Sequence, residues 1–186
     1  MSAETVISIC LGVGLAASVG FRVFLPLFAL SLAAYFNIWP LNEAWQWIGS
    51  LPTLTVLGVA TVVEILAYII PFVDNLLDSI AVPLAAIAGT AVMVSTVTDL
   101  SPVITWALAI IAGGGTAAAI AGTASATRLT SSATTAGIAN PIVATVETTS
   151  AVVLAVVSIF LPVLAIILVI GIFFFIAKLY KKFKPQ

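Results

Sequence analysis

Long apolar runs with few polar interruptions make up most of the chain. Five such runs cover residues 5–36, 51–70, 79–98, 103–127 and 141–179. A run of about 20 apolar residues is long enough to cross the hydrocarbon core of a bilayer as a helix. The pattern therefore predicts an all-α, polytopic membrane protein in which residues 1–186 form a single transmembrane domain.

Two of these runs are too long for one straight crossing. Residues 5–36 would form a helix of about 48 Å, against a hydrocarbon core of about 30 Å. The glycines before Arg22, together with Pro26 after it, predict a break at this point. In the last run, the sequence Phe-Leu-Pro that ends at Pro162 predicts a tight turn between two spans. The resulting expectation is about six transmembrane helices.

The connections between the runs suggest an orientation. Residues 37–50 contain three tryptophans and no Lys or Arg, which predicts an interfacial loop anchored by aromatic side chains. Residues 178–186 contain four lysines, so the positive-inside rule predicts a basic cytoplasmic tail in the cell (inner) membrane. Six spans would place the N-terminus in the cytoplasm as well. The N-terminus lacks the positive region of a cleavable signal, so we expect the first run to stay in the membrane.

Residues 128–141 are small and polar but almost uncharged. Irregular backbone of this kind is tolerated at membrane depth only where it is buried in protein or lines a wet cavity. Two interpretations follow from the sequence. The stretch is either a re-entrant or cavity-lining segment, or an ordinary short loop.

Composition supports the membrane interpretation and excludes several functions. Apolar residues make up 62% of the chain and charged residues 7%, against roughly 45–50% and about 25% in soluble domains. A net charge of −1 without histidine excludes a basic nucleic-acid surface and removes the imidazole metal ligand. Cys10 is the only cysteine, which excludes an intrachain disulfide. We expect no cofactor and no bound metal.

Four ionisable residues interrupt the spans or lie beside them: Arg22, Glu64, Arg128 and Glu147. A charge at the bilayer centre costs about 2.5–3.5 kcal/mol on insertion scales, so four unpaired charges would cost on the order of 10 kcal/mol. They must therefore pair, face the bundle interior or reach water. They form either a functional polar site or a set of structural clamps, because buried ion pairs alone are weak evidence for stability.

Two further acids, Asp74 and Asp78, lie at the junction of the second and third spans. They are four residues apart on one helical face, and they would also complement the dipole of the third helix. Residues 71–78 resemble residues 141–147, and residues 17–22 resemble residues 124–128. These matches predict an internal duplication whose halves are inverted, as in many secondary transporters.

Small residues are concentrated between Gly113 and Ala124. Such residues let helix backbones approach closely, within one chain or between copies in a homo-oligomer. They also leave room for a substrate beside the two arginines. Both interpretations are open at this stage.

Taken in order along the chain, these motifs resemble an uncharacterised bacterial family of small polytopic membrane proteins, domain of unknown function family 4126. The resemblance covers essentially the whole chain. It implies the fold and the membrane location but no activity, and it adds Asn140 to the candidate residues. The chain departs from the pattern at Thr123, where relatives are expected to carry histidine, and in having a single acid at Glu147. The matching segments are Gly20–Pro26, Glu64, Pro71–Asp74 with Asp78, Ala126–Arg128, Asn140–Pro141 and Glu147.

The leading hypothesis is a small transporter or channel-like protein. Arg22 and Arg128 would bind an anionic solute or a lipid head group, while Glu64 and Glu147 balance them or exchange a proton or cation. The alternative is a scaffold or accessory subunit whose charges only hold helices together. An enzyme is not expected, because no nucleophile or metal set accompanies the carboxylates and no phosphate-binding or dinucleotide-binding motif is present.

Overall fold

The computed structural model describes residues 2–68 and 70–183, with side chains described except at positions 71, 72, 74, 75, 179, 180, 182 and 183. The part of the chain that is described is all-helical, which confirms the predicted fold class. In chain order the elements are α1 (Ala3–Val19), α2 (Phe24–Tyr35), η1 (Glu43–Gly49), α3 (Leu51–Ala67), α4 (Pro71–Thr96), α5 (Pro102–Leu108), η2 (Ala109–Gly114), α6 (Gly115–Thr135), α7 (Asn140–Phe160) and α8 (Pro162–Phe183).

Prolines and capping hydroxyls set where several helices begin. The Ser2 side chain accepts a hydrogen bond from the backbone of Thr5 at the start of α1, and Ser50 caps α3 in the same way. A proline lies in the first turn of α3, α4, α5 and α7. A backbone N–H at this position would have no partner within the helix, so its absence in proline costs no hydrogen bond. The predicted turn before Pro162 is confirmed, because α7 ends at Phe160 and α8 begins at Pro162.

The predicted break in the first apolar run is also confirmed, and it reverses the chain. Gly14 in α1 packs against Ser158, near the C-terminal end of α7. Trp39, just beyond α2, donates from Nε1 to the carbonyl oxygen of Ile159 at 2.7 Å, at the same end of α7. Between them Arg22 reaches the opposite half of α7. Helices α1 and α2 therefore form a hairpin with its tip at residues 20–23.

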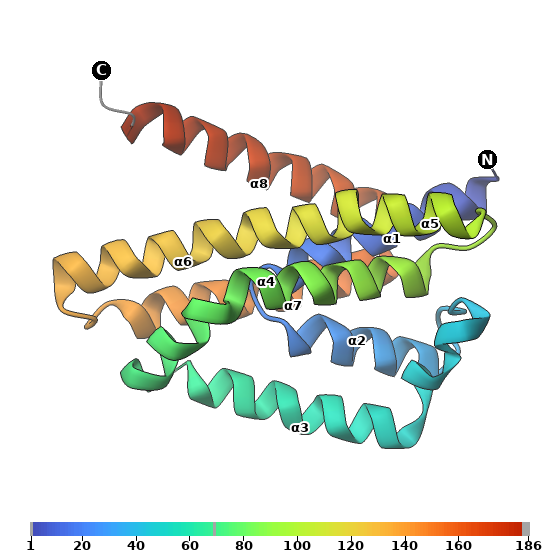
Figure 1. The fold of residues 1–186 in the computed structure, drawn as a ribbon, viewed down its shortest axis with the longest axis horizontal. Coiled ribbons are helices and arrows are strands. Elements are labelled where there is room, and N and C mark those ends of the chain that lie inside the picture. Colours follow the sequence, from blue (N-terminus) through green and yellow to red (C-terminus); the bar gives the residue numbers. More distant parts are fainter. Residues whose placement is uncertain (1, 69, 184–186) are drawn as a thin grey trace.

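The remaining helices run the length of the molecule (Figure 1). Elements α5, η2 and α6 form one continuous helical stretch, Pro102–Thr135, of 34 residues. It packs against α4 through glycines, because a Cβ on Gly113 would lie 2.6 Å from the carbonyl oxygen of Gly89. The small residues of this region therefore let two backbones touch, as predicted for close helix packing.

Length and composition identify this chain as a helical membrane protein. Three helical stretches in the described residues are long and apolar enough to cross a bilayer, and η1 with α3, bent by 62°, makes a fourth. The count of six spans stays a prediction, because α1, α2 and the apolar part of α8 are shorter. The three long stretches are Leu76–Thr96, Pro102–Thr135 and Asn140–Phe160, and the shorter ones are Ala3–Val19, Phe24–Tyr35 and Pro162–Lys178.

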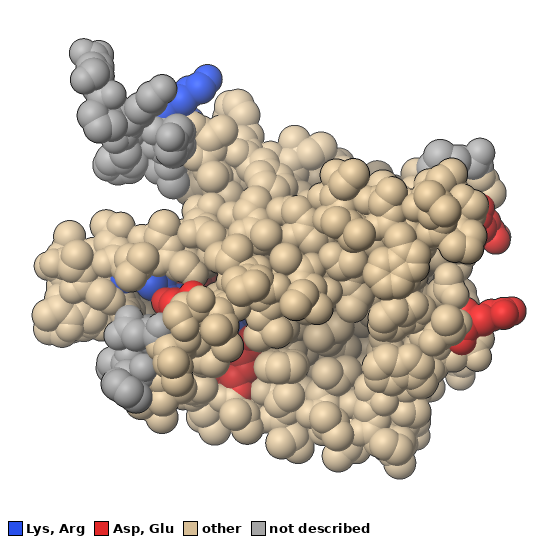
Figure 2. Space-filling view, in the orientation of Figure 1, with Lys and Arg blue, Asp and Glu red and all other residues tan. Residues whose placement is uncertain are grey.

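The two chain ends lie at opposite ends of the bundle (Figure 1). Six spans with both termini in the cytoplasm would have placed them at one end. The difference arises because the α1–α2 hairpin returns to the end from which it starts. Acidic side chains mark the N-terminal end, whereas Lys178 and Lys181 lie on the last turns of α8 (Figure 2).

Two predicted connecting segments are more ordered than expected. In residues 37–50 the chain forms η1, where the rings of Trp45 and Trp47 stack with their centres 6.1 Å apart. In residues 128–141, α6 continues as far as Thr135, and a short turn with positive φ at Ala136 and Gly137 leads into α7. Most of this small-polar stretch is thus helix.

Candidate functional site: a buried cluster of ion pairs

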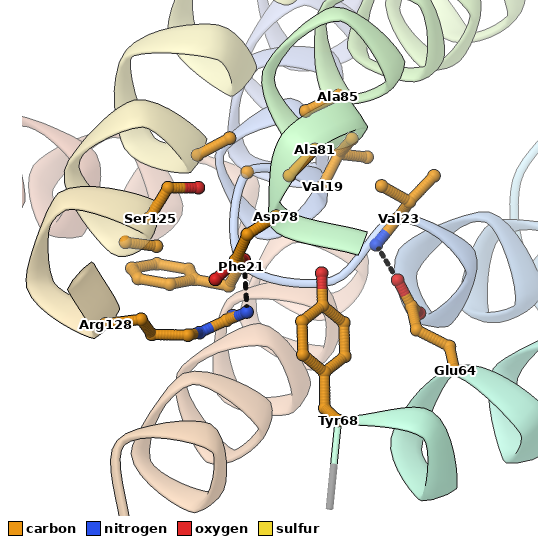
Figure 3. A pocket seen from close by; sticks show the side chains of 13 residues that line it. Val19, Phe21, Val23, Glu64, Tyr68, Asp78, Ala81, Ala85, Ser125 and Arg128 are labelled. Carbon is orange, nitrogen blue, oxygen red and sulfur yellow. Dashed lines mark hydrogen bonds and ion pairs between the residues drawn. The ribbon is translucent and has the colours of Figure 1, made fainter. Parts of the chain in front are cut away.

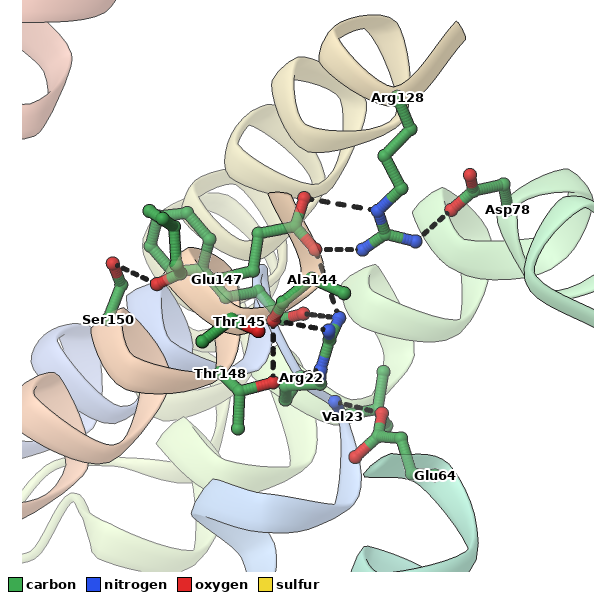
Figure 4. Close-up of polar contacts among 12 residues, drawn as sticks. Arg22, Val23, Glu64, Asp78, Arg128, Ala144, Thr145, Glu147, Thr148 and Ser150 are labelled. Atoms are coloured by element: carbon green, nitrogen blue, oxygen red, sulfur yellow. Dashed lines mark hydrogen bonds and ion pairs between the residues drawn. The ribbon is translucent and has the colours of Figure 1, made fainter. Parts of the chain in front are cut away.

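Four charged side chains from different elements meet near one end of the bundle (Figure 3; Figure 4). Arg22 comes from the hairpin tip, Asp78 from α4, Arg128 from α6 and Glu147 from α7. Their side chains expose 0%, 10%, 3% and 6% of their surface, respectively. The expectation that buried charges gather away from lipid holds for these residues.

Glu147 lies at the centre of the cluster. Its Oε2 accepts hydrogen bonds from Arg22 Nη1, at 3.1 Å, and from Arg128 Nη2, while its Oε1 accepts from Arg128 Nε at 3.2 Å (Figure 4). One carboxylate therefore binds two guanidinium groups through charge-assisted hydrogen bonds. This shared carboxylate keeps two like charges close together in a nearly dry environment.

The rest of the Arg22 guanidinium bonds to neutral groups. Its Nε donates to Thr148 Oγ1, Nη1 donates to the carbonyl oxygen of Phe21, and Nη2 donates to that of Ala144, each at 3.0 Å. All three guanidinium nitrogens thus have partners, as a fully buried cation requires. Thr148 was not among the predicted residues, although its position next to Glu147 was the signal that could have indicated it.

Arg128 is held by a second carboxylate. Its Nη1 donates to Asp78 Oδ1 at 2.6 Å (Figure 3). The side chain of Asp74, the other acid predicted at this junction, lies outside the described residues. Asp78 thus does more than complement a helix dipole, because it forms an ion pair with the arginine of a distant segment.

The matched segments pair crosswise, but they are not inverted. Arg22 at the end of α1 binds Glu147 of α7, and Arg128 of α6 binds Asp78 of α4. Helices α1 and α6 run in the same direction, and so do α4 and α7 (Figure 1). The expected inversion is therefore wrong for these segments. Between α1 and α6 the α1–α2 hairpin adds one reversal and makes the number even, whereas between α4 and α7 the number is even without it.

Glu64 has a role that the sequence did not indicate. Its two carboxylate oxygens accept hydrogen bonds from the backbone N–H groups of Val23, at 2.7 Å, and Phe24, at 3.0 Å. These are the cap and first residues of α2. A carboxylate here satisfies unpaired amides and complements the positive end of the helix dipole. Glu64 therefore fixes the hairpin tip to α3.

The Tyr68 ring links the two arginines. The Cζ atom of Arg22 lies 4.0 Å from the ring centre and that of Arg128 lies 4.1 Å from it. Both distances are within the range of cation–π attraction. Sequence reasoning missed this residue. Its spacing of four from Glu64 places both side chains on one face of α3, and that was the available signal.

Asn140 lies at the start of α7 and is buried. Its Nδ2 donates to Ser132 Oγ at 2.9 Å, which ties the beginning of α7 to the last turn of α6. Asn140 thus lies at the connection between α6, which carries Arg128, and α7, which carries Glu147.

Between α3, α4 and α6 the cluster has very little free space beside it. A cavity of about 10 Å³ is lined by Glu64, Tyr68, Asp78 and Arg128 together with small and apolar residues (Figure 3). This volume is close to the minimum that one water molecule needs. Arg22 and Glu147 do not line it. The cavity therefore connects only some of the predicted residues, and the cluster is closed in this conformation.

The fold and site define an all-helical membrane protein with a closed, buried cluster of ion pairs. Within the described part of the chain, no group of three or more Cys, Asp or Glu side chains is arranged to hold a metal ion. The chain belongs to the family described as Domain of unknown function (DUF4126), whose model matches residues 9–182. The resemblance inferred from the motifs is thus confirmed. No curated protein and no solved structure matches the chain.

Proposed function

We propose that this protein is a small membrane transporter that binds one anionic group between Arg22 and Arg128. The observation that carries the proposal is that Glu147 Oε2 accepts hydrogen bonds from both guanidinium groups. In the closed conformation an internal carboxylate occupies the place that the cargo's anionic group would take. Paired guanidinium groups suit carboxylate or phosphate oxygens, which accept two parallel hydrogen bonds.

The hairpin supports this proposal. Discontinuous helices that end at a buried polar site are a recurring feature of secondary transporters. The α1–α2 hairpin has this form, with Arg22 at its tip. Ionisable residues inside membrane bundles commonly mark the paths of ions and substrates.

Anion binding requires a change at Glu147. If Glu147 stayed ionised, its carboxylate would repel a bound anion, and this repulsion would weaken anion binding. When Glu147 takes up a proton, an incoming anion leaves the total charge of the cluster unchanged. We infer that cargo and proton bind together. The lysine-bearing end faces the cytoplasm in this proposal, as the positive-inside rule requires, and the protein resides in the cell (inner) membrane.

Uptake into reconstituted vesicles tests the proposal. Radiolabelled lactate, phosphate and chloride serve as probes, with a pH-sensitive dye inside the vesicles. We expect at least one probe to enter with a proton, and Arg128→Gln to reduce its uptake at least about tenfold, the loss of about 1.4 kcal/mol of binding. Lys178→Gln, a change outside the cluster, should have no effect.

A structural clamp is the second candidate, and the four hydrogen bonds of the Arg22 guanidinium, which give each of its nitrogens a partner, favour it. Buried ion pairs are often replaceable by apolar residues without loss of stability. If the paired change Arg22→Met with Glu147→Met preserves or raises the melting temperature, and no probe enters wild-type vesicles, the cluster is a clamp and the transport proposal fails.

A further inference from the structure

A wide apolar groove opens between α6, α7 and α8. It has a volume of about 700 Å³, within the range of about 300–1,000 Å³ that small-molecule sites occupy. It forms because α8 diverges from α6 toward its C-terminal end (Figure 1). Its walls include Ile120, Val146, Ile167, Leu168, Ile172 and Phe175.

The groove leads to the ion-pair cluster. Glu147, the carboxylate that both arginines bind, is the one charged residue among the described residues that line it. Phe21, which precedes Arg22 in the hairpin tip, lines both the groove and the small cavity of the cluster. Glu147 therefore stands between a long apolar wall and two guanidinium groups.

We propose that the groove binds the chain of a single-chain carboxylic acid of the fatty-acid type, with its acid group at the arginines. The inference rests on the proposed function and specifies its cargo. The apolar wall ends at Glu147, which binds two cations behind it, and a ligand with an apolar chain and one acidic end complements this arrangement once its acid group takes the place of Glu147. A small water-soluble anion would make no use of such a wall.

Charge balance supports a ligand that arrives as a neutral acid. A carboxylic acid in contact with acyl chains is stable in its protonated form, because burying an unpaired charge is costly. At the end of the groove, the acid's O–H bond breaks and its proton forms a new bond with a carboxylate oxygen of Glu147. The ligand is then a carboxylate that accepts hydrogen bonds from Arg22 and Arg128. One acid and one carboxylate are present before and after, so the net charge is unchanged.

Gly171 provides a specific way to fill the groove. It lines the groove, and a Cβ at this position would meet no atom within 4 Å, so a larger side chain extends into open space. Gly115 is a matched control, because a Cβ there also meets open space but the residue is not part of the groove. Both positions lie within helices, so the effect on helix propensity is equal in Gly171→Phe and Gly115→Phe.

The test measures binding of radiolabelled palmitate to the full-length protein in phosphatidylcholine nanodiscs. We expect saturable binding that weakens at least about tenfold in Gly171→Phe and is unchanged in Gly115→Phe. Unlabelled laurate should compete, whereas dodecyltrimethylammonium, with a chain of the same length and a cationic head, should not. Arg128→Gln should weaken binding, and Gly171→Phe covers the case in which the Arg128 variant fails to fold.

Four results would overturn the inference: absence of palmitate binding, equal binding by Gly171→Phe, better competition by the cationic amphiphile, or a Gly171→Phe change in oligomeric state without palmitate binding. The last result would assign the groove to a second copy of the chain. Anion uptake without palmitate binding would overturn this inference alone. Palmitate binding without uptake of palmitate or of any small-anion probe into the vesicles would overturn the transport proposal alone.

Discussion

Arg22 and Arg128 bind the same carboxylate, yet the protein holds them in different ways. Arg22 extends from a break between two helices, and two backbone carbonyls and a threonine satisfy most of its donors. Arg128 extends from the middle of a long helix, and its bonds go to two carboxylates, Glu147 and Asp78. Arg22 is thus built into the fold, whereas Arg128 is held by charges that a ligand or a proton can replace.

This difference suggests that the two arginines contribute unequally to the stability of the fold and to ligand binding in the cluster. Removing Arg22 takes a donor away from the buried carbonyl oxygens of Phe21 and Ala144, of which that of Ala144 keeps the hydroxyl of Thr148. Removing Arg128 takes away the cation that the carboxylates of Glu147 and Asp78 bind, together with one of the two cation–π contacts of Tyr68. Arg22 should therefore matter most for folding, and Arg128 most for whatever binds in the cluster.

The largest expected effect follows from replacing Arg22 alone. Arg22→Met removes the side-chain donor to the Phe21 carbonyl at the hairpin tip and one partner of Glu147, so we expect a loss of about 3–5 kcal/mol of folding free energy. Denaturant titration of the purified protein in mixed micelles measures this loss. A stability equal to wild type would remove the distinction between the two arginines.

Replacement of Arg128 should cost less stability and more binding. Arg128→Gln retains a hydrogen-bonding group and leaves Glu147 paired with Arg22, so we expect a loss of about 1–3 kcal/mol. The same titration provides the comparison, and palmitate binding provides the second measurement. A larger loss of stability than in Arg22→Met would reverse the order proposed here.

The Glu64 cap should have a smaller, local effect. Glu64→Ala removes the acceptor of the N–H groups at the start of α2, and a lost cap typically costs about 0.5–2 kcal/mol. Hydrogen exchange should accelerate in residues 20–27 and stay unchanged in α6. Uniform acceleration along the chain would show instead that Glu64 supports the whole bundle.

An effect of similar size, divided between two contacts, is expected at Tyr68, whose ring contacts both arginines at nearly equal distances. Tyr68→Leu removes cation–π attraction of about 0.5–2 kcal/mol for each. Double-mutant cycles with Arg22→Met and Arg128→Gln measure the two couplings separately. Coupling to one arginine only would show that the ring does not link them.

Much of the fold could be predicted from local signals. The excess length of the first run, with glycines before Arg22 and a proline after it, was enough to predict a break. The cost of isolated charges in lipid was enough to predict that Arg22, Arg128 and Glu147 pair, face the bundle interior or reach water. Both predictions rest on local constraints, the excess length of a helix and the free-energy cost of a charge in lipid, which do not depend on the rest of the sequence.

The missing parts depend on direction and on partners that local patterns do not specify. A break does not reveal whether the chain continues or turns back, so the hairpin, and with it the relative position of the chain ends, could not be predicted. Glu64 looked like a partner for an arginine. Its role as an acceptor for the first N–H groups of α2 depends on α2 beginning beside it, which the sequence does not reveal. Tyr68 was missed because an aromatic residue at the end of an apolar run is ordinary at a membrane interface.

The α1–α2 hairpin has a further consequence for how the molecule is handled in a cell. Because it enters and leaves at one end of the bundle, we expect the start of α1 and the end of α8 to lie on opposite sides of the membrane. Fusion partners attached to the start and to the finish would then be delivered to opposite faces of the membrane, whichever way the protein is inserted.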